Sequence, residues 1–290
     1  MDPDAGANDW GVHVIAVPFD TARRGWRMGA GPEHLLSNGL ADRVRRQGHD
    51  VTVVIVEPMR SDPAEIATAF DLMARVAEHV RLAVDRGAFP LVLSGNCNTA
   101  IGTLSGLAPK DRAVLWFDAH GDANTPDSTI TGFLDGTGLA AALGWCWNGM
   151  TKQIPGFTPV EPDSVLVIGA RDLDADEVSL LERGRVCRLT PADVDTSRLS
   201  TALSALPDAV AYVHCDLDVL DPSVGRANPF LVPGGLSLLS LQNAISAISR
   251  RMPIGAAAVT AYAPEYDEDG RICIAALQIV DAIIAAARPR

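Results

Sequence analysis

The stretch that decides the fold reads VLWFDAHGD and spans residues 114–122. An apolar run is followed at once by three groups that can bind a cation: Asp118, His120 and Asp122. Successive side chains of an extended strand alternate between its two faces, so these three groups share one face if the strand continues past Phe117. The pattern predicts a buried strand whose carboxyl end carries metal ligands.

A second stretch repeats this design further along the chain. It reads VAYVHCDLDVLDP over residues 210–222 and places Asp216 and Asp218 on one face at the end of an apolar run. Two carboxylates this close repel each other unless cations neutralise them. A lone Asp-x-Asp often caps a helix or closes a loop, but its combination with Asp-x-His-x-Asp favours a metal site. Oxygen-rich ligands with one imidazole suit Mn²⁺ better than a structural zinc ion.

Short β-branched runs recur along the chain and alternate with helical patterns. The clearest helix begins near Asp62, where Asp62 can cap, Pro63 suits the first helical position and Glu65 follows. Its apolar stripe comprises Ile66, Phe70, Met73, Ala77, Val80 and Val84. The predicted strands are 12–17, 51–56, 90–93, 113–117, 165–168, 209–213 and 255–259. Apolar strands joined by such helices indicate one α/β domain over residues 1–290, with a mainly parallel sheet covered on both faces and a flexible N-terminus at about 1–10.

Polar clusters follow four of these runs at the point where each run ends. They are SGNCN after Leu93, DAHGD after Phe117, RDLDADE after Ala170 and DLD after Cys215. In parallel sheets, ligands bind beyond the carboxyl ends of the strands. These clusters are therefore expected to meet at one edge of the sheet.

The composition limits the classes of partner. The net charge of −12 argues against nucleic-acid and anionic-membrane partners, which call for a basic face. No apolar run reaches the roughly 18 residues of a membrane span, and the N-terminus does not resemble a signal peptide. The cysteines are odd in number, scattered and without a CxxC pair, namely Cys97, Cys146, Cys187, Cys215 and Cys273. A reduced cytoplasmic location is expected.

Two motifs carry a family resemblance. DAHGDANTPDS (118–128) and DLDVLDPS (216–223) resemble the signature motifs of the ureohydrolases, which include arginase and agmatinase. The resemblance extends over most of the chain, from Gly31-Pro32 through PGGLS (233–237) to Pro264. It implies a three-layer α/β/α sandwich with a mainly parallel sheet of about eight strands. Family members often form trimers or hexamers, so the resemblance leaves a homo-oligomer open.

The resemblance also implies a ligand set for two Mn²⁺ ions per chain. Asp118 and Asp216 would bridge the ions. Asp122 would complete one site, while His120 and Asp218 would complete the other. Five of the family's six metal ligands are thus present in their expected positions.

The sixth family ligand, a histidine, is replaced by Cys97. The segment 94–98 reads SGNCN, and the Ala-Ile-Gly of residues 100–102 fixes its register against the family motif. One interpretation makes Cys97 a thiolate ligand whose pKa the ion lowers. The other makes it a small buried residue at a vacated position, which leaves that metal weak or absent. Sulfur is a softer ligand than Mn²⁺ usually takes.

Three further residues match the positions that hold the substrate in arginases. The resemblance implies that Asn124 and Thr131 bind the α-carboxylate of the substrate and that Asp174 accepts its α-ammonium group. An amide, a hydroxyl and a carboxylate make a suitable clamp for a small amino-acid substrate. Structural interpretations remain open, since Asn124 and Thr131 suit turns and Asp174 suits a helix cap.

Two departures from arginases bear on the substrate. Asp135 stands where arginases have an acid histidine, and Ala261 stands where they have the glutamate that meets the guanidinium. A buried guanidinium without its carboxylate is costly, whereas a hydroxyguanidine is less basic and can bind neutral. The sequence resembles the Nω-hydroxy-L-arginine hydrolase branch, which includes the enzyme of D-cycloserine biosynthesis and in which a cysteine replaces the histidine ligand. That branch hydrolyses Nω-hydroxy-L-arginine to L-ornithine and hydroxyurea.

The expected mechanism is attack on the hydroxyguanidine carbon by hydroxide, formed from a water that two metal ions share. Asp218 would relay the proton of the nucleophile to the departing amine, and Asp135 could assist if its pKa is raised. Two alternatives stay open: hydrolysis of L-arginine or another guanidino acid, and a metal-poor binding protein without catalysis.

The remaining histidines have no ligand-type neighbours in sequence and are interpreted as packed or surface residues. They are His13, His34, His49, His79 and His214. His214 is the one that could lie near the metal site, because it lies two residues before Asp216 and therefore on the same strand face.

Overall fold

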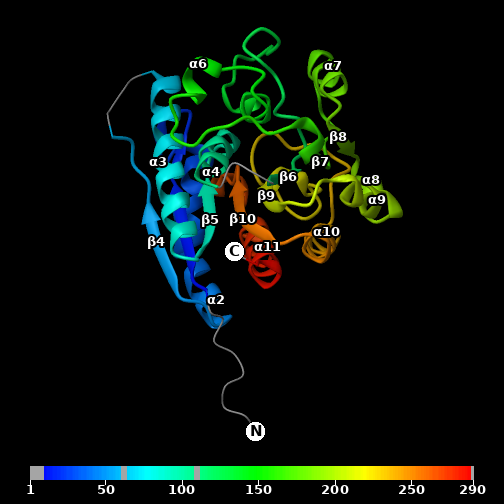
Figure 1. Ribbon diagram of the computed structural model, residues 1–290. Helices are drawn as coiled ribbons and strands as arrows, with labels where there is room; N and C mark the ends of the chain where they lie inside the picture. Colours follow the sequence, from blue (N-terminus) through cyan, green and yellow to red (C-terminus); the bar gives the residue numbers. More distant parts are fainter. Residues whose placement is uncertain (1–9, 60–63, 108–111, 289–290) are drawn as a thin grey trace.

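The computed structural model describes residues 10–59, 64–107 and 112–288. Within them, one sheet of parallel strands runs in the order β4-β1-β5-β10-β9-β6-β7-β8 (Figure 1). The strands are β1 (Val12–Val17), β4 (Val51–Ile55), β5 (Phe89–Ser94), β6 (Arg112–Phe117), β7 (Val165–Ile168), β8 (Cys187–Leu189), β9 (Val210–Asp216) and β10 (Ile254–Thr260). A small antiparallel pair is formed by β2 (Phe19–Asp20) and β3 (Arg23–Arg24). The predicted parallel sheet of about eight strands is confirmed.

Helices cover both faces of this sheet, as the predicted three-layer sandwich requires (Figure 1). One face packs against α1 (Gly31–Ser37), α2 (Leu40–Arg46), α8 (Pro191–Val194), α9 (Ser197–Ala205), α10 (Leu238–Arg251) and α11 (Arg271–Ala286). The other packs against α3 (Glu65–Asp85), α4 (Ala100–Gly106), α5 (Gly138–Ala142) and α7 (Ala175–Gly184). The short α6 (Asn148–Thr151) and the 3-10 turns η1 (Arg27–Ala30), η2 (Cys97–Thr99), η3 (Asp135–Thr137), η4 (Pro162–Ser164), η5 (Leu217–Val219) and η6 (Pro264–Tyr266) lie in the connections.

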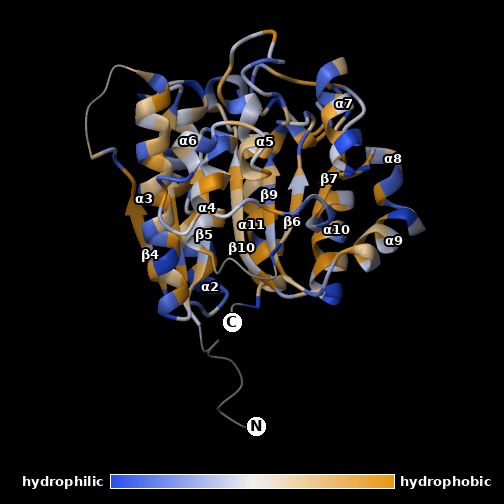
Figure 2. Cartoon of the chain, turned by 45° about the horizontal axis from the view of Figure 1, so that its top comes forward, coloured by the Kyte–Doolittle hydropathy of each residue, from blue (hydrophilic) through white to orange (hydrophobic). Residues whose placement is uncertain are grey.

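Strand β6 shows why its apolar run is continuous rather than alternating. Leu115 and Phe117 belong to the core beneath α10 and α11, while Val114 and Trp116 belong to the core beneath α3 and α4. All four side chains are fully buried because each face of the sheet is covered. Figure 2 shows the same pattern, with the apolar colour concentrated in the strands at the centre.

Helix α3 bears out the predicted apolar stripe. Phe70, Met73, Ala77 and Val80 are buried against α4 and the sheet, and Ile66 and Val84 are half-buried. The predicted cap at Asp62 and Pro63 lies outside the described residues, as do residues 1–9 of the predicted flexible N-terminus. None of the described helices is long and apolar enough to cross a membrane.

Two glycines of α4 let that helix approach α3 closely. A Cβ atom at Gly102 would lie 2.3 Å from the carbonyl oxygen of Met73, and one at Gly106 would lie 2.5 Å from Cβ of Val80. Helix α4 begins directly after η2, which carries Cys97. The close contact therefore fixes the position of a candidate metal ligand.

Candidate metal centre

The candidate centre lies where the four central strands end. Strands β5, β10, β9 and β6 are neighbours in the sheet, and their register sets Ser94 opposite Thr260, and Thr260 opposite Asp216. A cleft of about 280 Å³ opens at this edge. It is lined by nine of the predicted site residues, namely Cys97, His120, Asp122, Asn124, Thr131, Asp135, Asp174, Asp216 and Asp218. The tenth, Asp118, is buried, and its carboxylate contacts His120.

One group of candidate ligands surrounds His120. Its Nδ1 atom lies 3.3 Å from Oδ1 of Asp118 and 3.4 Å from Oδ2 of Asp218. The three ligand atoms all lie within 4.8 Å of one another. This arrangement of one imidazole and two carboxylates can hold a divalent cation.

A second group lies beside it, around Cys97. The Sγ atom of Cys97 lies 3.0 Å from Oδ2 of Asp216. Asp122 lines the same cleft, and its buried Oδ2 atom has no hydrogen-bond partner among the described residues. A buried carboxylate oxygen without a partner is costly unless a cation meets it, so the donor set fits a second ion.

The carboxylates of the centre perturb one another. Burial, followed by repulsion from Asp218, raises the pKa values of Asp118 and Asp216. Burial also opposes the ionisation of Asp218, but its hydrogen bonds, chiefly from His120, lower the pKa of this carboxyl overall. Burial disfavours charged His120 as well, yet the bonds to Asp118 and Asp218 raise its pKa to about 12. Bound divalent cations reverse this balance because they stabilise ionised carboxylates and neutral imidazole.

Burial, followed by the charge of Asp216, also raises the pKa of the Cys97 thiol. A thiolate at this position therefore needs a cation, which lowers the pKa of a sulfur that binds to it. This requirement links the ligand interpretation of Cys97 directly to occupancy of the site.

The side chains behind the centre fix its carboxylates. Trp116 donates its indole N–H to Oδ2 of Asp118 over 3.1 Å. Asn228 is fully buried and donates through Nδ2 to Oδ2 of Asp218 (3.2 Å) and to the carbonyl of Ala261 (3.0 Å). Sequence reasoning missed Asn228, because its loop carries no ligand-type neighbour that would mark it.

Asp122 and Ala261 both have positive φ, of 48° and 59°, which is uncommon outside glycine and is found at functional sites.

Asp135 anchors the loop that presents Cys97. Its carboxylate accepts hydrogen bonds from the backbone N–H groups of Cys97 (3.0 Å) and Asn98 (2.7 Å) and from Nδ2 of Asn96 (3.0 Å). Burial raises the pKa of Asp135 to about 7 against the opposing effect of these bonds. The structure thus gives Asp135 a positioning role, and its catalytic role stays a prediction.

The three predicted substrate-binding residues reach the same cleft. Nδ2 of Asn124 donates to Oδ2 of Asp174 over 3.1 Å. Asp174 also caps α7 in a reciprocal arrangement with Glu177, so the helix-cap interpretation is confirmed alongside its place in the cleft. Thr131 accepts a hydrogen bond from the backbone of Phe133, as a turn residue would. Its role in substrate binding stays a prediction.

Comparison with known proteins identifies the family. The model of the arginase family matches residues 11–285. The chain belongs to the arginase family. An arginase from Bacillus caldovelox is 29% identical over 94% of this chain and 97% of that protein. An Nω-hydroxy-L-arginine amidinohydrolase from Streptomyces lavendulae is 28% identical over 87% of this chain and 91% of that protein. The solved structure of the Bacillus caldovelox arginase superposes with a TM-score of 0.86 at 27% identity, covering 95% of this chain and 98% of that one.

Membership of the arginase family confirms the predicted resemblance. The chain is therefore a hydrolase that acts on guanidino carbon–nitrogen bonds. The family depends on a binuclear metal centre, and this chain holds acidic and histidine side chains that can bind metal at the expected strand ends.

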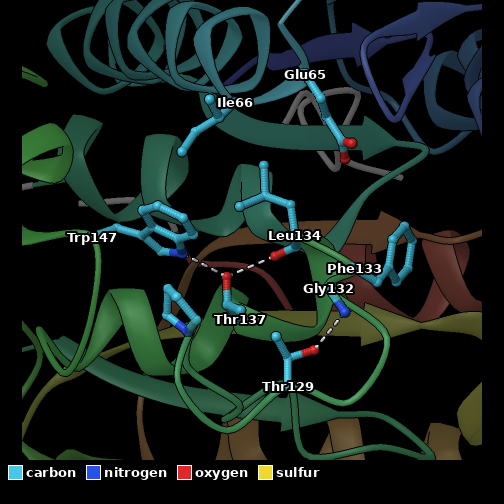
Figure 3. Close-up of a pocket in the computed structure, with 9 residues that line it drawn as sticks. Glu65, Ile66, Thr129, Gly132, Phe133, Leu134, Thr137 and Trp147 are labelled. Carbon is cyan, nitrogen blue, oxygen red and sulfur yellow. Dashed lines mark hydrogen bonds between the residues drawn. The ribbon is translucent and has the colours of Figure 1, made fainter.

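The arginase-family cleft shares a wall with a second cavity of about 400 Å³ (Figure 3). The shared wall is the segment 129–137, and Phe133 lines both cavities. Hydrogen bonds hold this wall: Trp147 donates through Nε1 to Oγ1 of Thr137 (3.0 Å), and Thr137 donates to the carbonyl of Leu134 (2.7 Å). The wall carries Thr131 and Asp135, so these bonds support two candidate site residues.

His214 is packed, as the sequence indicates, but it also approaches the centre. It is fully buried, its ring stacks on Trp116 with centroids 3.7 Å apart, and burial lowers its pKa to about 3. A ligand atom of His214 lies within 4.8 Å of those of Cys97 and Asp118. Sequence reasoning left His214 outside the ligand set because its neighbours in the chain before Asp216 are ordinary strand residues.

Proposed function

We propose that this arginase-family hydrolase cleaves Nω-hydroxy-L-arginine to L-ornithine and hydroxyurea and uses two Mn²⁺ ions. The observation that carries this proposal is Ala261, which lines the cleft just beyond β10. The resemblance to arginases places a guanidinium-binding glutamate at this position. An apolar methyl group there favours a weakly basic hydroxyguanidine over a guanidinium cation, whose burial without a counter-charge is costly.

The clamp for the amino-acid part of the substrate rests on Asn124 and Asp174. These side chains are hydrogen-bonded to each other and line the cleft that holds the carboxylate centre. An amide and a carboxylate at one end of the cleft can receive the α-carboxylate and α-ammonium groups of an amino acid. Recognition at this end supports an amino-acid substrate over a decarboxylated amine.

The Mn²⁺ ions, when bound, would be held by Asp118, Asp216, His120, Asp218 and Asp122, with Cys97 as the sixth candidate, and they would supply hydroxide from water near neutral pH. Asp218 then receives the proton of the attacking water at a carboxylate oxygen and passes it to the departing δ-nitrogen of ornithine. The new carbon–oxygen bond forms first, and the carbon–nitrogen bond to ornithine breaks once its nitrogen has received the proton. Asn228 supports this transfer because it holds Oδ2 of Asp218 in place.

Hydrolysis of L-arginine is the second candidate function. It is favoured by the arginase relatives, which match this chain at similar identity to the Streptomyces enzyme. The two substrates favour different side chains at position 261. Only a guanidinium cation is stabilised by a carboxylate there, whereas a neutral hydroxyguanidine is not.

The test is steady-state release of urea and hydroxyurea from manganese-loaded protein, with L-arginine and Nω-hydroxy-L-arginine as parallel substrates. We expect kcat/KM to favour the hydroxylated substrate by about tenfold or more, or about 1.4 kcal/mol in the transition state. Comparable or better turnover of L-arginine would refute the proposal. Fewer than one ion per chain after manganese loading would favour a non-catalytic binding protein.

A matched pair of variants isolates the charge at this position. Ala261→Glu is expected to shift selectivity toward L-arginine, while Ala261→Gln, which has the same shape without the charge, is not. Equal shifts in the two variants would mean that size rather than charge selects the substrate.

A further inference from the structure

Three buried side chains from three strand ends form a second type of ligand group. Cys97 follows β5, Asp118 follows β6 and His214 lies in β9. Their ligand atoms, a sulfur, an oxygen and an imidazole nitrogen, all lie within 4.8 Å of one another. All three residues are at most 2% exposed. Such spacing suits one cation bound by all three groups.

The orientation of His214 turns one ring nitrogen toward this group. Oγ1 of Thr260 lies 3.1 Å from Sγ of Cys97 and 3.5 Å from Nε2 of His214, so Nε2 is the ring nitrogen that lies near the same hydroxyl as the cysteine. The other nitrogen, Nδ1, lies 3.0 Å from the hydroxyl of Tyr212. Metal-binding histidines commonly engage a partner through the nitrogen that does not bind the metal, which fixes the tautomer.

The orientation of the His214 ring is also fixed by stacking. Trp116 stacks on His214 at an interplanar angle of 16°, and the same tryptophan donates to Oδ2 of Asp118. One side chain therefore aligns two members of the group. Ligands that are fixed before the metal arrives bind it with a smaller loss of conformational entropy.

We propose that Nε2 of His214 is a metal ligand at the Cys97 side of the centre, and that this site binds a zinc-type or cobalt-type ion more tightly than it binds the Mn²⁺ of the proposed function. The proposal rests on the binuclear site of the proposed function. Thiolate and imidazole ligands favour zinc, cobalt and iron, whereas the carboxylate-rich site around His120 suits manganese. The two sites share Asp118, so a chain offered both kinds of metal would hold two unlike ions side by side.

This arrangement accounts for the loss of the family histidine at position 97. The imidazole is then supplied from β9 rather than from the loop after β5. The site keeps one imidazole but gains a sulfur. Cys97 and His214 are thus a coupled pair, and replacing either one alone is expected to damage the site.

The test is titration of the metal-free full-length chain with Co²⁺. A thiolate–cobalt charge-transfer band in the near ultraviolet reports the Cys97 site, and Cys97→Ser should abolish it. We expect His214→Gln to weaken Co²⁺ binding at the band-forming site by about 100-fold or more, beyond the 10–100-fold typical of losing an outer-shell partner. The control is His13→Gln, which changes a buried histidine of β1 and should leave Co²⁺ affinity unchanged.

X-ray absorption at the zinc edge tests the same point without a variant. Wild-type protein loaded with one equivalent of Zn²⁺ should show one sulfur and one imidazole in the first coordination shell. Sulfur without imidazole, or a cobalt band whose affinity His214→Gln leaves within twofold, would overturn the role of His214 but not the proposed function. Imidazole without sulfur would place zinc at His120 and overturn the metal preference. Failure to bind Co²⁺ and Zn²⁺ by a chain that still binds Mn²⁺ would overturn the metal preference alone, whereas failure to bind Mn²⁺ as well would overturn the proposed function too.

Discussion

We expect the substitution Gly102→Ala to destabilise the protein, although alanine favours helices. The added Cβ would lie 2.3 Å from the carbonyl oxygen of Met73, whereas real Cβ contacts essentially never fall below 3.0 Å. Helices α3 and α4 must therefore separate by about 0.7 Å or more. The atom in the way belongs to the backbone, so no side-chain rotation relieves the contact.

The magnitude follows from two opposing effects. Alanine in place of glycine gains about 1 kcal/mol of helix propensity. Overpacking in a filled core costs about 1–3 kcal/mol, and here α3 and α4 are both packed on the sheet. Because the backbone itself must move, we place the cost at the upper end and expect a net loss of about 1–2 kcal/mol. That corresponds to a drop in Tm of about 2–4 °C for each kcal/mol.

Thermal unfolding followed by circular dichroism measures this effect, and Gly149→Ala is the matched control. Gly149 lies in α6 with no atom within 4 Å of its added Cβ, so the same substitution should leave Tm unchanged or raise it. Helix α4 begins just after η2, so Gly102→Ala should also weaken metal binding at Cys97. A Tm for Gly102→Ala at or above that of the wild type would refute the reasoning.

Three other perturbations test the site and its supports. Burial raises the pKa of Glu177 from 4.5 to about 7, so ionised Glu177 lowers the stability of the fold as pH rises through this window. Glu177→Gln should therefore raise Tm relative to wild type more at pH 8 than at pH 4.5. An equal difference in Tm at both pH values would contradict this. Asn228→Ala removes the donor to Asp218 and should lower kcat for hydroxyarginine by about 10–100-fold with little change in KM; a kcat within twofold of wild type would argue against it. Removing metal with a chelator should lower Tm, since an ion present at 1,000 times its Kd stabilises by about 4 kcal/mol per site, and an unchanged melting curve would count against the metal centre.

Much of the fold could be predicted because its signals are local. Each of the seven predicted apolar runs corresponds to a strand, and the polar clusters after them meet at one sheet edge. One strand of the eight-stranded sheet was not predicted. Strand β8 was not predicted because it is only three residues long and includes the exposed Cys187, so it forms no apolar run. It is a strand only because β7 pairs with it at the edge of the sheet.

The candidate site could be predicted where its candidate ligands follow one another along the chain, and not where they come from different strands. Asp118, His120 and Asp122 could be recognised as one group because they occupy alternate positions along the chain. Asn228 and His214 could not be recognised in this way. Asn228 matters because it contacts Asp218, and His214 because it lies near Cys97, and only the folded sheet brings these residues together. Asp135 shows a third situation, in which a residue chosen for chemistry proves to hold three donors of a neighbouring loop.

The stacking of Trp116 on His214 also gives the protein a built-in optical reporter. The indole is fully buried, contacts the imidazole face to face and donates its N–H to Asp118. Its emission therefore depends on the electric field of the groups that would receive a cation. Capture and release of an ion can then be followed in real time by intrinsic fluorescence, and replacing the other tryptophans (Trp10, Trp26, Trp145 and Trp147) would leave a single emitter beside the centre.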